Sequence, residues 1–318
     1  MRMIPDKSNS KRWLASGPAK RGIAPLGVAC CMALSLCACG SSTSATSASL
    51  LQVVAAENPW GAIATAIGGS HVSVTSILSD PTADPHSYSA SASSAAAVAN
   101  ASVVLQNGLG YDDFMNQLLG TGSTKSRIVV TASTAMGITE ANANPHLWYA
   151  VEEVPKMASA ITRAFSKADP THKSDYERNA TLFVQSLSPL ISSIHAIAAQ
   201  RHGTPVAQTE RVAQYLLQES GLRIASPAGF AASIENGSEP NAADSQSMSS
   251  VITKNEIAVL VYNLQASSST TQTVRTMARS HGIPVVGVTE TVVPAHLSYA
   301  SWQGAQIQQL VHALKVTT

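Results

Sequence analysis

Two polar loops, each between a strand-like run and a helix-like run, constrain the fold of this chain more than any other feature. The first, residues 79–88, follows the alternating run 71–78 and contains Asp84-Pro85-His86. The second contains Asn144-Pro145-His146-Leu147-Trp148 and follows the strand-like run 127–131. Alternation at a period of two favours a strand, and open α/β sheets bind ligands in loops that follow strands. These loops therefore predict an α/β fold with a ligand site.

Two later strand-to-helix junctions carry a carboxylate where the first two carry a histidine. Glu210 follows the run 204–208, and Glu290 follows the run 283–288. Imidazole and carboxylate groups are common ligands of divalent transition metals. His86, His146, Glu210 and Glu290 therefore make a candidate metal site.

Alternation of strands and helices recurs on both sides of a long helical stretch, which includes the expected helices 151–167 and 172–200. The expected strands are 50–56, 71–78, 102–106, 127–131, 204–208, 223–226, 257–262 and 283–288. This pattern predicts two α/β lobes, each with a central, mostly parallel sheet flanked by helices. We expect an N-terminal lobe over 50–170, a long connecting helix over 171–201, and a C-terminal lobe over 202–318. Ligand residues from both lobes would meet in the cleft between them.

The amino terminus has the pattern of an export signal. Basic residues, including Lys20 and Arg21, precede an apolar stretch, 22–38, of 17 residues. This length is short for a membrane-spanning helix and typical of a signal-peptide core. The stretch ends in Leu36-Cys37-Ala38-Cys39-Gly40, which resembles a bacterial lipobox with Cys39 as the lipidated residue. We expect a lipoprotein signal peptide over 1–39 and a flexible tether over 40–49; an uncleaved anchor is the alternative.

Composition excludes several classes of protein. All four cysteines lie at or before residue 39, so the rest of the chain has no disulfide and depends on its core or on a bound metal. Six of the 20 Lys and Arg and one of the 19 Asp and Glu precede residue 40, so the remaining net charge is 14 − 18 = −4. This charge gives no indication of nucleic-acid binding, and neither a dinucleotide fingerprint nor a phosphate loop occurs. We expect a monomer.

By these residues the chain resembles the TroA-like family, the metal-binding lipoproteins of bacterial ABC importers for zinc, manganese or iron. The resemblance covers about 51–314 and includes the segment 209–215 and Val288-Thr289-Glu290-Thr291. It implies a solute-binding protein and no enzyme. Such a protein, tethered to the outside of the cell membrane, would bind Zn²⁺ or Mn²⁺ and deliver it to a permease driven by an ATPase. It also implies that His86, His146, Glu210 and Glu290 hold the metal.

Some residues depart from the pattern of that family. Asn144 stands where Asp is usual, so a carboxylate that could orient His146 is missing. Arg211 directly follows Glu210 and would weaken metal binding unless its side chain points away. Glu290 is one methylene longer than the Asp common in manganese members, while the His-rich loop of many zinc members is absent. His296 is near enough to Glu290 in sequence to be a spare ligand.

Two other functions fit some of these observations. A secreted metal-dependent hydrolase would need an open metal position for water, which four protein ligands leave little room for, and no His-Glu-x-x-His motif occurs. An adhesin-like surface lipoprotein would hold the metal as a structural ion.

The candidate ligands also bear on the choice of metal. A mixed nitrogen and oxygen ligand set should bind both zinc and manganese, with zinc tighter than manganese.

Overall fold

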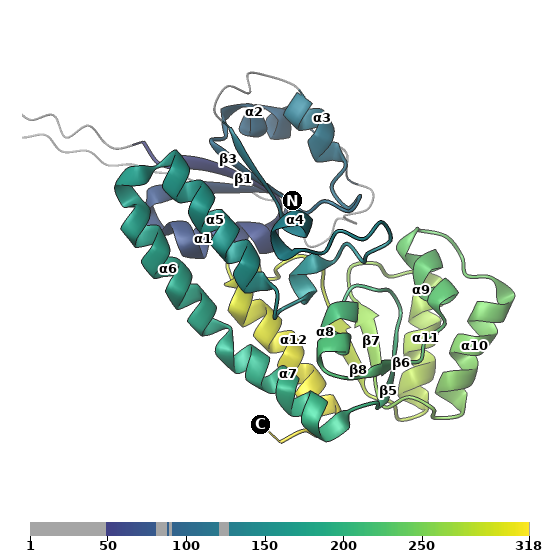
Figure 1. Cartoon of the computed structure of the whole chain (residues 1–318). Coiled ribbons are helices and arrows are strands. Elements are labelled where there is room, and N and C mark those ends of the chain that lie inside the picture. Colours follow the sequence, from purple (N-terminus) through teal and green to yellow (C-terminus); the bar gives the residue numbers. More distant parts are fainter. Residues whose placement is uncertain (1–48, 81–87, 89–90, 121–126, 318) are drawn as a thin grey trace, which may run out of the picture. The chain divides into compact units, whose positions relative to one another are not determined.

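Two four-stranded parallel sheets form the framework of the chain (Figure 1). The computed structural model describes residues 49–80, 88, 91–120 and 127–317. Strand order is β2-β1-β3-β4 in the first sheet and β6-β5-β7-β8 in the second, and every neighbouring pair is parallel. The predicted fold class is therefore confirmed. His86 and Cys39 lie outside the described residues.

The N-terminal lobe surrounds the first sheet with helices on both faces. Its strands are β1 (Leu51–Glu57), β2 (Val72–Leu78), β3 (Val103–Gln106) and β4 (Ile128–Thr131). Its helices are α1 (Asn58–Gly68), α2 (Ala92–Asn100), α3 (Phe114–Gly120), α4 (Ala132–Met136) and α5 (Val154–Ala168). Two of these helices begin at residues that favour a helix start. Pro59 occupies the first turn of α1, and the Ser91 side chain accepts a hydrogen bond from the backbone N–H of Ser94 to cap α2.

The C-terminal lobe repeats this arrangement. Its strands are β5 (Pro205–Gln208), β6 (Arg223–Ile224), β7 (Leu260–Asn263) and β8 (Val285–Val288). Its helices are α8 (Gln214–Glu219), α9 (Ala228–Glu235), α10 (Ala242–Thr253), α11 (Ser269–Ser280) and α12 (Tyr299–Ala313).

Two local sequence signals in this lobe differ from the structure. The Gly, Ser, Asn and Pro content of residues 228–244 favours a loop. Residues 228–235 form α9 instead, because Phe230 and Ile234, four positions apart, bury their side chains in a cluster with α10 and β7. The sequence that follows β5 favours a helix over 210–220, but α8 begins only at Gln214, so Glu210 stands in the turn before it.

The connection between the lobes is a bent helical segment rather than one straight helix. It contains α6 (Lys173–Ser186) and α7 (Ser188–Arg201), with Pro189 in the first turn of α7. Within the described part of the chain, Pro170–Arg201 is the one helical segment whose length and apolar composition would allow it to cross a membrane. However, α6 packs against α1 and α5, and α7 packs against α12, with Phe183 and Ile194 buried in the main core. It therefore connects the lobes through buried contacts.

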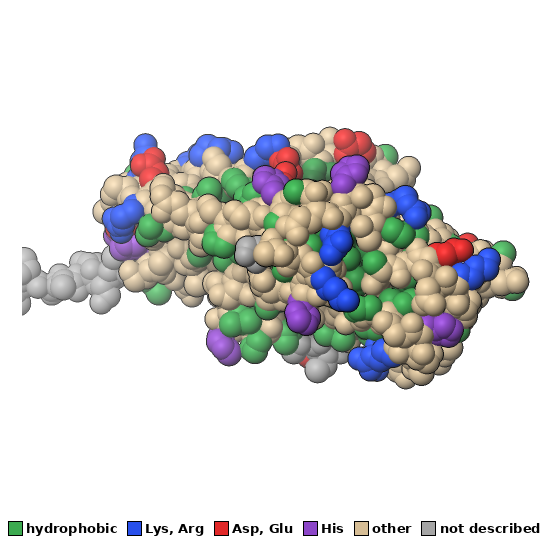
Figure 2. Space-filling model, turned by 90° about the horizontal axis from the view of Figure 1, so that it is seen from below, with side chains coloured by type: hydrophobic (Ala, Val, Ile, Leu, Met, Phe, Trp, Pro, Cys, Tyr) green, Lys and Arg blue, Asp and Glu red, His purple; other side chains and the backbone are tan. Residues whose placement is uncertain are grey.

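The main hydrophobic cluster contains residues of both lobes. Trp60 and Trp148 from the N-terminal half and Trp302 from α12 are at most 2% exposed within it. On the face in Figure 2, lysine and arginine side chains are scattered singly and in small groups among neutral ones. The carboxyl ends of the strands in the two sheets meet near this shared core, and the candidate site lies there.

Candidate metal centre

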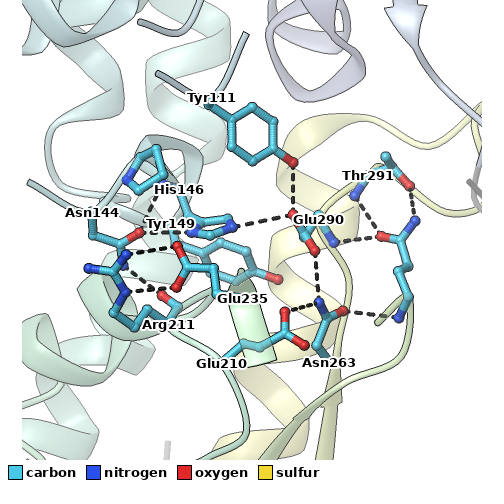
Figure 3. Close-up of polar contacts among 12 residues, drawn as sticks. Tyr111, Asn144, His146, Tyr149, Glu210, Arg211, Glu235, Asn263, Glu290 and Thr291 are labelled. Atoms are coloured by element: carbon cyan, nitrogen blue, oxygen red, sulfur yellow. Dashed lines mark hydrogen bonds and ion pairs between the residues drawn. The ribbon is translucent and has the colours of Figure 1, made fainter. Parts of the chain in front are cut away.

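Three side chains from the second sheet meet at the carboxyl ends of its strands. Glu210 follows β5, Asn263 ends β7, and Glu290 follows β8. The Asn263 amide donates to Glu210 Oε2 at 2.8 Å and to Glu290 Oε1 at 2.7 Å. All three residues are at most 2% exposed. Figure 3 shows Asn263 between the two carboxylates.

His146 reaches the same place from the N-terminal half. It precedes a short 3-10 helix, Leu147–Tyr149, and is fully buried. His146 Nε2 lies 3.2 Å from Glu290 Oε2, and the Tyr111 hydroxyl donates to that same oxygen at 2.7 Å. The Glu290 carboxylate therefore joins the two lobes, as Figure 3 shows.

The Asn144 amide orients the His146 ring. Its Oδ1 lies 2.7 Å from His146 Nδ1 and accepts from the His146 backbone N–H at 3.1 Å, while its Nδ2 donates to the Arg211 carbonyl at 2.6 Å. Because the contact with Arg211 fixes which end of the amide is the acceptor, His146 Nδ1 must carry the hydrogen. The carboxylate is absent, as the sequence shows, and the amide oxygen of Asn144 is the acceptor that orients His146 in its place. Whether this change lowers metal affinity stays a prediction.

The Arg211 side chain points to another acidic residue, Glu235 of α9. Its Nε and Nη2 atoms donate to the two Glu235 carboxylate oxygens at 2.7 and 2.9 Å. These two hydrogen bonds raise the pKa of Arg211, so its guanidinium stays charged and forms an ion pair with Glu235. Arg211 is therefore oriented away from Glu210, which is the arrangement that avoids weakening a metal site (Figure 3).

A buried polar chain holds the loop that carries His146. Asp112 accepts hydrogen bonds from the backbone N–H groups of Asn107 and Gly108 at 2.6 and 2.8 Å. The Asn107 amide in turn donates to the Pro145 carbonyl at 2.7 Å, immediately before His146. Burial raises the pKa of the Asp112 carboxyl group. Burial also raises the pKa of the neighbouring Glu57 carboxyl group, and the negative charge of Asp112 raises it further.

Of the four predicted ligands, three are described: His146 contacts Glu290 directly, and Glu210 is linked to Glu290 through Asn263. His86 and the Asp84-Pro85 pair before it lie outside the described residues. Within the described part of the chain, no group of three or more His, Cys, Asp or Glu side chains is arranged so that it could hold a metal ion. Hydrogen bonds of Glu290 to His146, Tyr111 and Asn263 occupy that region instead. These hydrogen bonds would have to rearrange before a metal could bind all four predicted ligands, of which His86 is the remaining one.

The other candidate ligand, His296, is exposed and lines a separate groove. This groove has a volume of about 410 Å³ and lies between α1, β2 and residues 295–298. Trp148 and Trp302 belong to the main hydrophobic cluster.

Two residues of the site were missed in the sequence. Tyr111 follows Asn107-Gly108-Leu109-Gly110, whose glycines indicate a turn in the sequence and nothing about a ligand. Asn263 ends a buried strand that was predicted to stop at residue 262. A signal for Asn263 was available, because it is a polar residue at the carboxyl end of an apolar strand, as Glu210 and Glu290 are near the ends of theirs.

Comparison with known proteins identifies the family of this chain. The family model ZnuA, described as the periplasmic component A of a zinc-uptake complex, matches residues 53–313. The chain belongs to this family. Its members are solute-binding proteins for metal uptake rather than enzymes.

Relatives of this family member are named for different metals. The manganese-binding lipoprotein MntA of Bacillus subtilis is 33% identical over 162 residues, which are 49% of this chain and 53% of MntA. The zinc-binding protein TroA of Treponema pallidum is 23% identical over 222 residues, 66% of this chain and 70% of TroA. The match with MntA, like those with other similar relatives, spans about half of the relative's length.

Solved structures share the fold. The solute-binding protein FpvC of Pseudomonas aeruginosa, in complex with Mn²⁺, superposes with a TM-score of 0.70 at 20% identity. The superposition covers 84% of this chain and 99% of FpvC. At this identity the likeness establishes the two-lobed fold.

Proposed function

We propose that this chain captures a divalent transition metal outside the cell membrane and delivers it to an ABC importer. The observation that supports this most directly is the link from Glu290 to two other predicted ligands, directly to His146 and through Asn263 to Glu210. These residues come from three different junctions in two lobes, and all are buried. Imidazole and carboxylate are both ligands of divalent transition metals.

The metal would be cargo held by His86, His146, Glu210 and Glu290. His146 suits this role because Asn144 holds its Nδ1–H and leaves Nε2 facing Glu290. Since Nδ1 already carries a hydrogen, the contact between Nε2 and Glu290 requires one more proton, on either group. A metal that takes up both groups replaces that proton, so binding should weaken as the pH falls.

Both Zn²⁺ and Mn²⁺ should bind, with zinc the tighter in vitro. The ligand set contains no thiolate and combines imidazole, which suits zinc, with carboxylate, which suits manganese. The order of stabilities for first-row divalent metals places zinc above manganese at almost any such site. Which metal the cell imports then depends on metal availability and on release to the permease.

The remaining parts of the proposal rest on the amino-terminal sequence and on the family. Cys39 would be lipidated and would anchor a monomeric protein to the outer face of the cell membrane through the tether 40–49. The partners would be a permease and its ATPase. Relatives named as metal-binding lipoproteins support this location.

Elemental analysis of the untagged protein purified without its signal peptide, followed by titration of the metal-free form with zinc and manganese, tests the proposal. We expect one equivalent of metal per chain, lost in His146→Ala and Glu290→Gln and retained in His281→Ala. His281 is an exposed histidine at the end of α11 and serves as the matched control. A metal-free protein that binds neither metal would overturn the proposal. Metal that leaves only when the protein unfolds would favour a structural ion.

A further inference from the structure

Asn263 occupies a position that the strand order of the second sheet makes special. Because β7 lies between β5 and β8, the last residue of β7 lies between the residues that follow the other two strands. Those residues include Glu210 and Glu290, which the proposed function makes metal ligands. A single amide is thereby placed between two carboxylates that are 80 positions apart in the chain.

The orientation of this amide is fixed by its own contacts. Asn263 Oδ1 accepts from the backbone N–H of Gln265 at 3.0 Å, so Nδ2 must be the end that faces the carboxylates. The backbone N–H of Asn263 donates to the Thr209 hydroxyl at 3.2 Å. With 1% of its surface exposed, Asn263 has no room to turn, and both of its Nδ2 hydrogens are engaged, one with each carboxylate.

The chemistry of the amide suits this position. Two buried carboxylates repel each other, and a donor shared between them reduces that repulsion. A lysine or arginine would do the same but would also repel an incoming cation. An aspartate would add a third negative charge. Asparagine holds Glu210 and Glu290 together without adding charge of either sign.

Asn263 also distinguishes between the two oxygens of each carboxylate. It bonds to Oε2 of Glu210 and to Oε1 of Glu290. The other oxygen of Glu290, Oε2, is the one that faces His146. Binding of a metal through both oxygens of either carboxylate would require the carboxylate to turn and would strain its bond to the amide.

We propose that Asn263 is a positioning residue that favours one-oxygen binding by Glu210 and Glu290 and so shifts the selectivity of the site from manganese toward zinc. The proposal rests on the proposed function. One-oxygen binding by both carboxylates keeps the coordination number of the metal low, toward the four that zinc prefers. Manganese belongs with the hard, oxygen-preferring ions of higher coordination, which two-oxygen carboxylates serve better.

The test compares dissociation constants for Zn²⁺ and Mn²⁺ in the parent, Asn263→Leu and Asn263→Asp. Loss of the amide donor should weaken zinc binding about 10-fold or more in Asn263→Leu, as for other residues that orient metal ligands. Manganese binding should weaken less, so the ratio of the two dissociation constants should shift in favour of manganese in both variants. X-ray absorption of the zinc-loaded variants should show more oxygen neighbours than in the parent. Asn263→Asp keeps the side-chain shape and an acceptor for Gln265, so it covers the case in which Asn263→Leu does not fold.

Tyr262→Phe is the matched control. Tyr262 is the preceding residue of β7, and its hydroxyl contacts Ser267 and Thr271, away from the carboxylates. Its removal disturbs the same strand and should leave the metal ratio unchanged. Equal weakening of both metals in the Asn263 variants, or an unchanged ratio, would overturn the positioning role. A parent protein that binds neither metal would overturn the proposed function as well, so the two failures are distinguishable.

Discussion

Tyr111 of the N-terminal lobe donates a 2.7 Å hydrogen bond to the Glu290 carboxylate of the C-terminal lobe. The two residues lie 179 positions apart, and both are buried. The same carboxylate oxygen faces His146, so the contact stabilises the lobes against each other at the point where a metal would bind.

Tyr111→Phe should therefore destabilise the metal-free protein more than the metal-bound one. A hydrogen bond to a charged group contributes about 1.5–3 kcal/mol, and we expect a loss of this order in urea unfolding of the metal-free form. The zinc dissociation constant should stay the same or decrease, because the metal no longer competes with the tyrosine.

Tyr88→Phe is the control for that experiment. The Tyr88 hydroxyl contacts Ser94 at 2.8 Å within the N-terminal lobe and is only partly buried. Its loss should have a smaller effect. Equal destabilisation by the two substitutions would show that the bond between Tyr111 and Glu290 has no special role.

Asn144 can be tested by two substitutions that separate its acceptor from its donor. Asn144→Ala removes the acceptor of His146 Nδ1–H, and zinc affinity should fall about 10–100-fold. Asn144→Asp restores the carboxylate usual in the family and keeps the acceptor, but it loses the donor to the Arg211 carbonyl. We expect it to retain zinc affinity and to lose about 1 kcal/mol of stability. Calorimetric titration and chemical denaturation of both variants provide the measurements; equal zinc affinity in the two would contradict an orienting role.

The sequence predicted the sheets and the ligand-bearing junctions but not the contacts between them. All eight strands were predicted from apolar runs and turn residues, because those signals are local. The role of Asn144 could not be inferred from its own loop, since its acceptor end is determined by the Arg211 carbonyl, 67 positions away. Asn263 and Tyr111 were missed for a similar reason: their partners are brought to them by strand order and by packing of the lobes.

Metal binding should stabilise the fold, because the predicted ligands come from both lobes and are separated in the unfolded chain. At free zinc of about 100 times the dissociation constant, the gain is about 2.7 kcal/mol. Differential scanning calorimetry should show a higher melting temperature with zinc in the parent. Glu290→Gln, which keeps the size of the side chain, should show little or no shift. An identical melting temperature of the parent with and without saturating zinc would contradict a site shared between the lobes.

Membrane attachment is predicted to depend on Cys39. If this residue is lipidated, Cys39→Ala should move the protein from the membrane fraction to the soluble fraction of cells that express the full chain. Fractionation and mass analysis of the amino terminus provide the measurement. A variant that stays in the membrane with an uncleaved amino terminus would favour the anchor alternative.

The stability of the protein should also depend on pH through Glu219, the last residue of α8. Its carboxyl group accepts from the backbone N–H groups of Val151 and Glu152, just before α5, at 3.2 and 3.3 Å. Burial raises the pKa of Glu219 to about 8, with a further contribution from the negative charge of Glu152. A folded-state pKa above the unfolded value means that the folded protein binds this proton more tightly. Its contribution to stability is thus complete at acidic pH and is lost as the pH rises toward 8.

Glu219→Gln separates this effect from other titrations, because glutamine resembles the protonated acid at every pH. We expect the parent to lose stability relative to Glu219→Gln between pH 5 and pH 8, by up to about 1.4 kcal/mol per pH unit. Urea unfolding of both proteins, in metal-free buffer at several pH values, gives the difference directly. A difference between the two proteins that is constant from pH 5 to pH 8 would show that Glu219 does not hold its proton in the folded state.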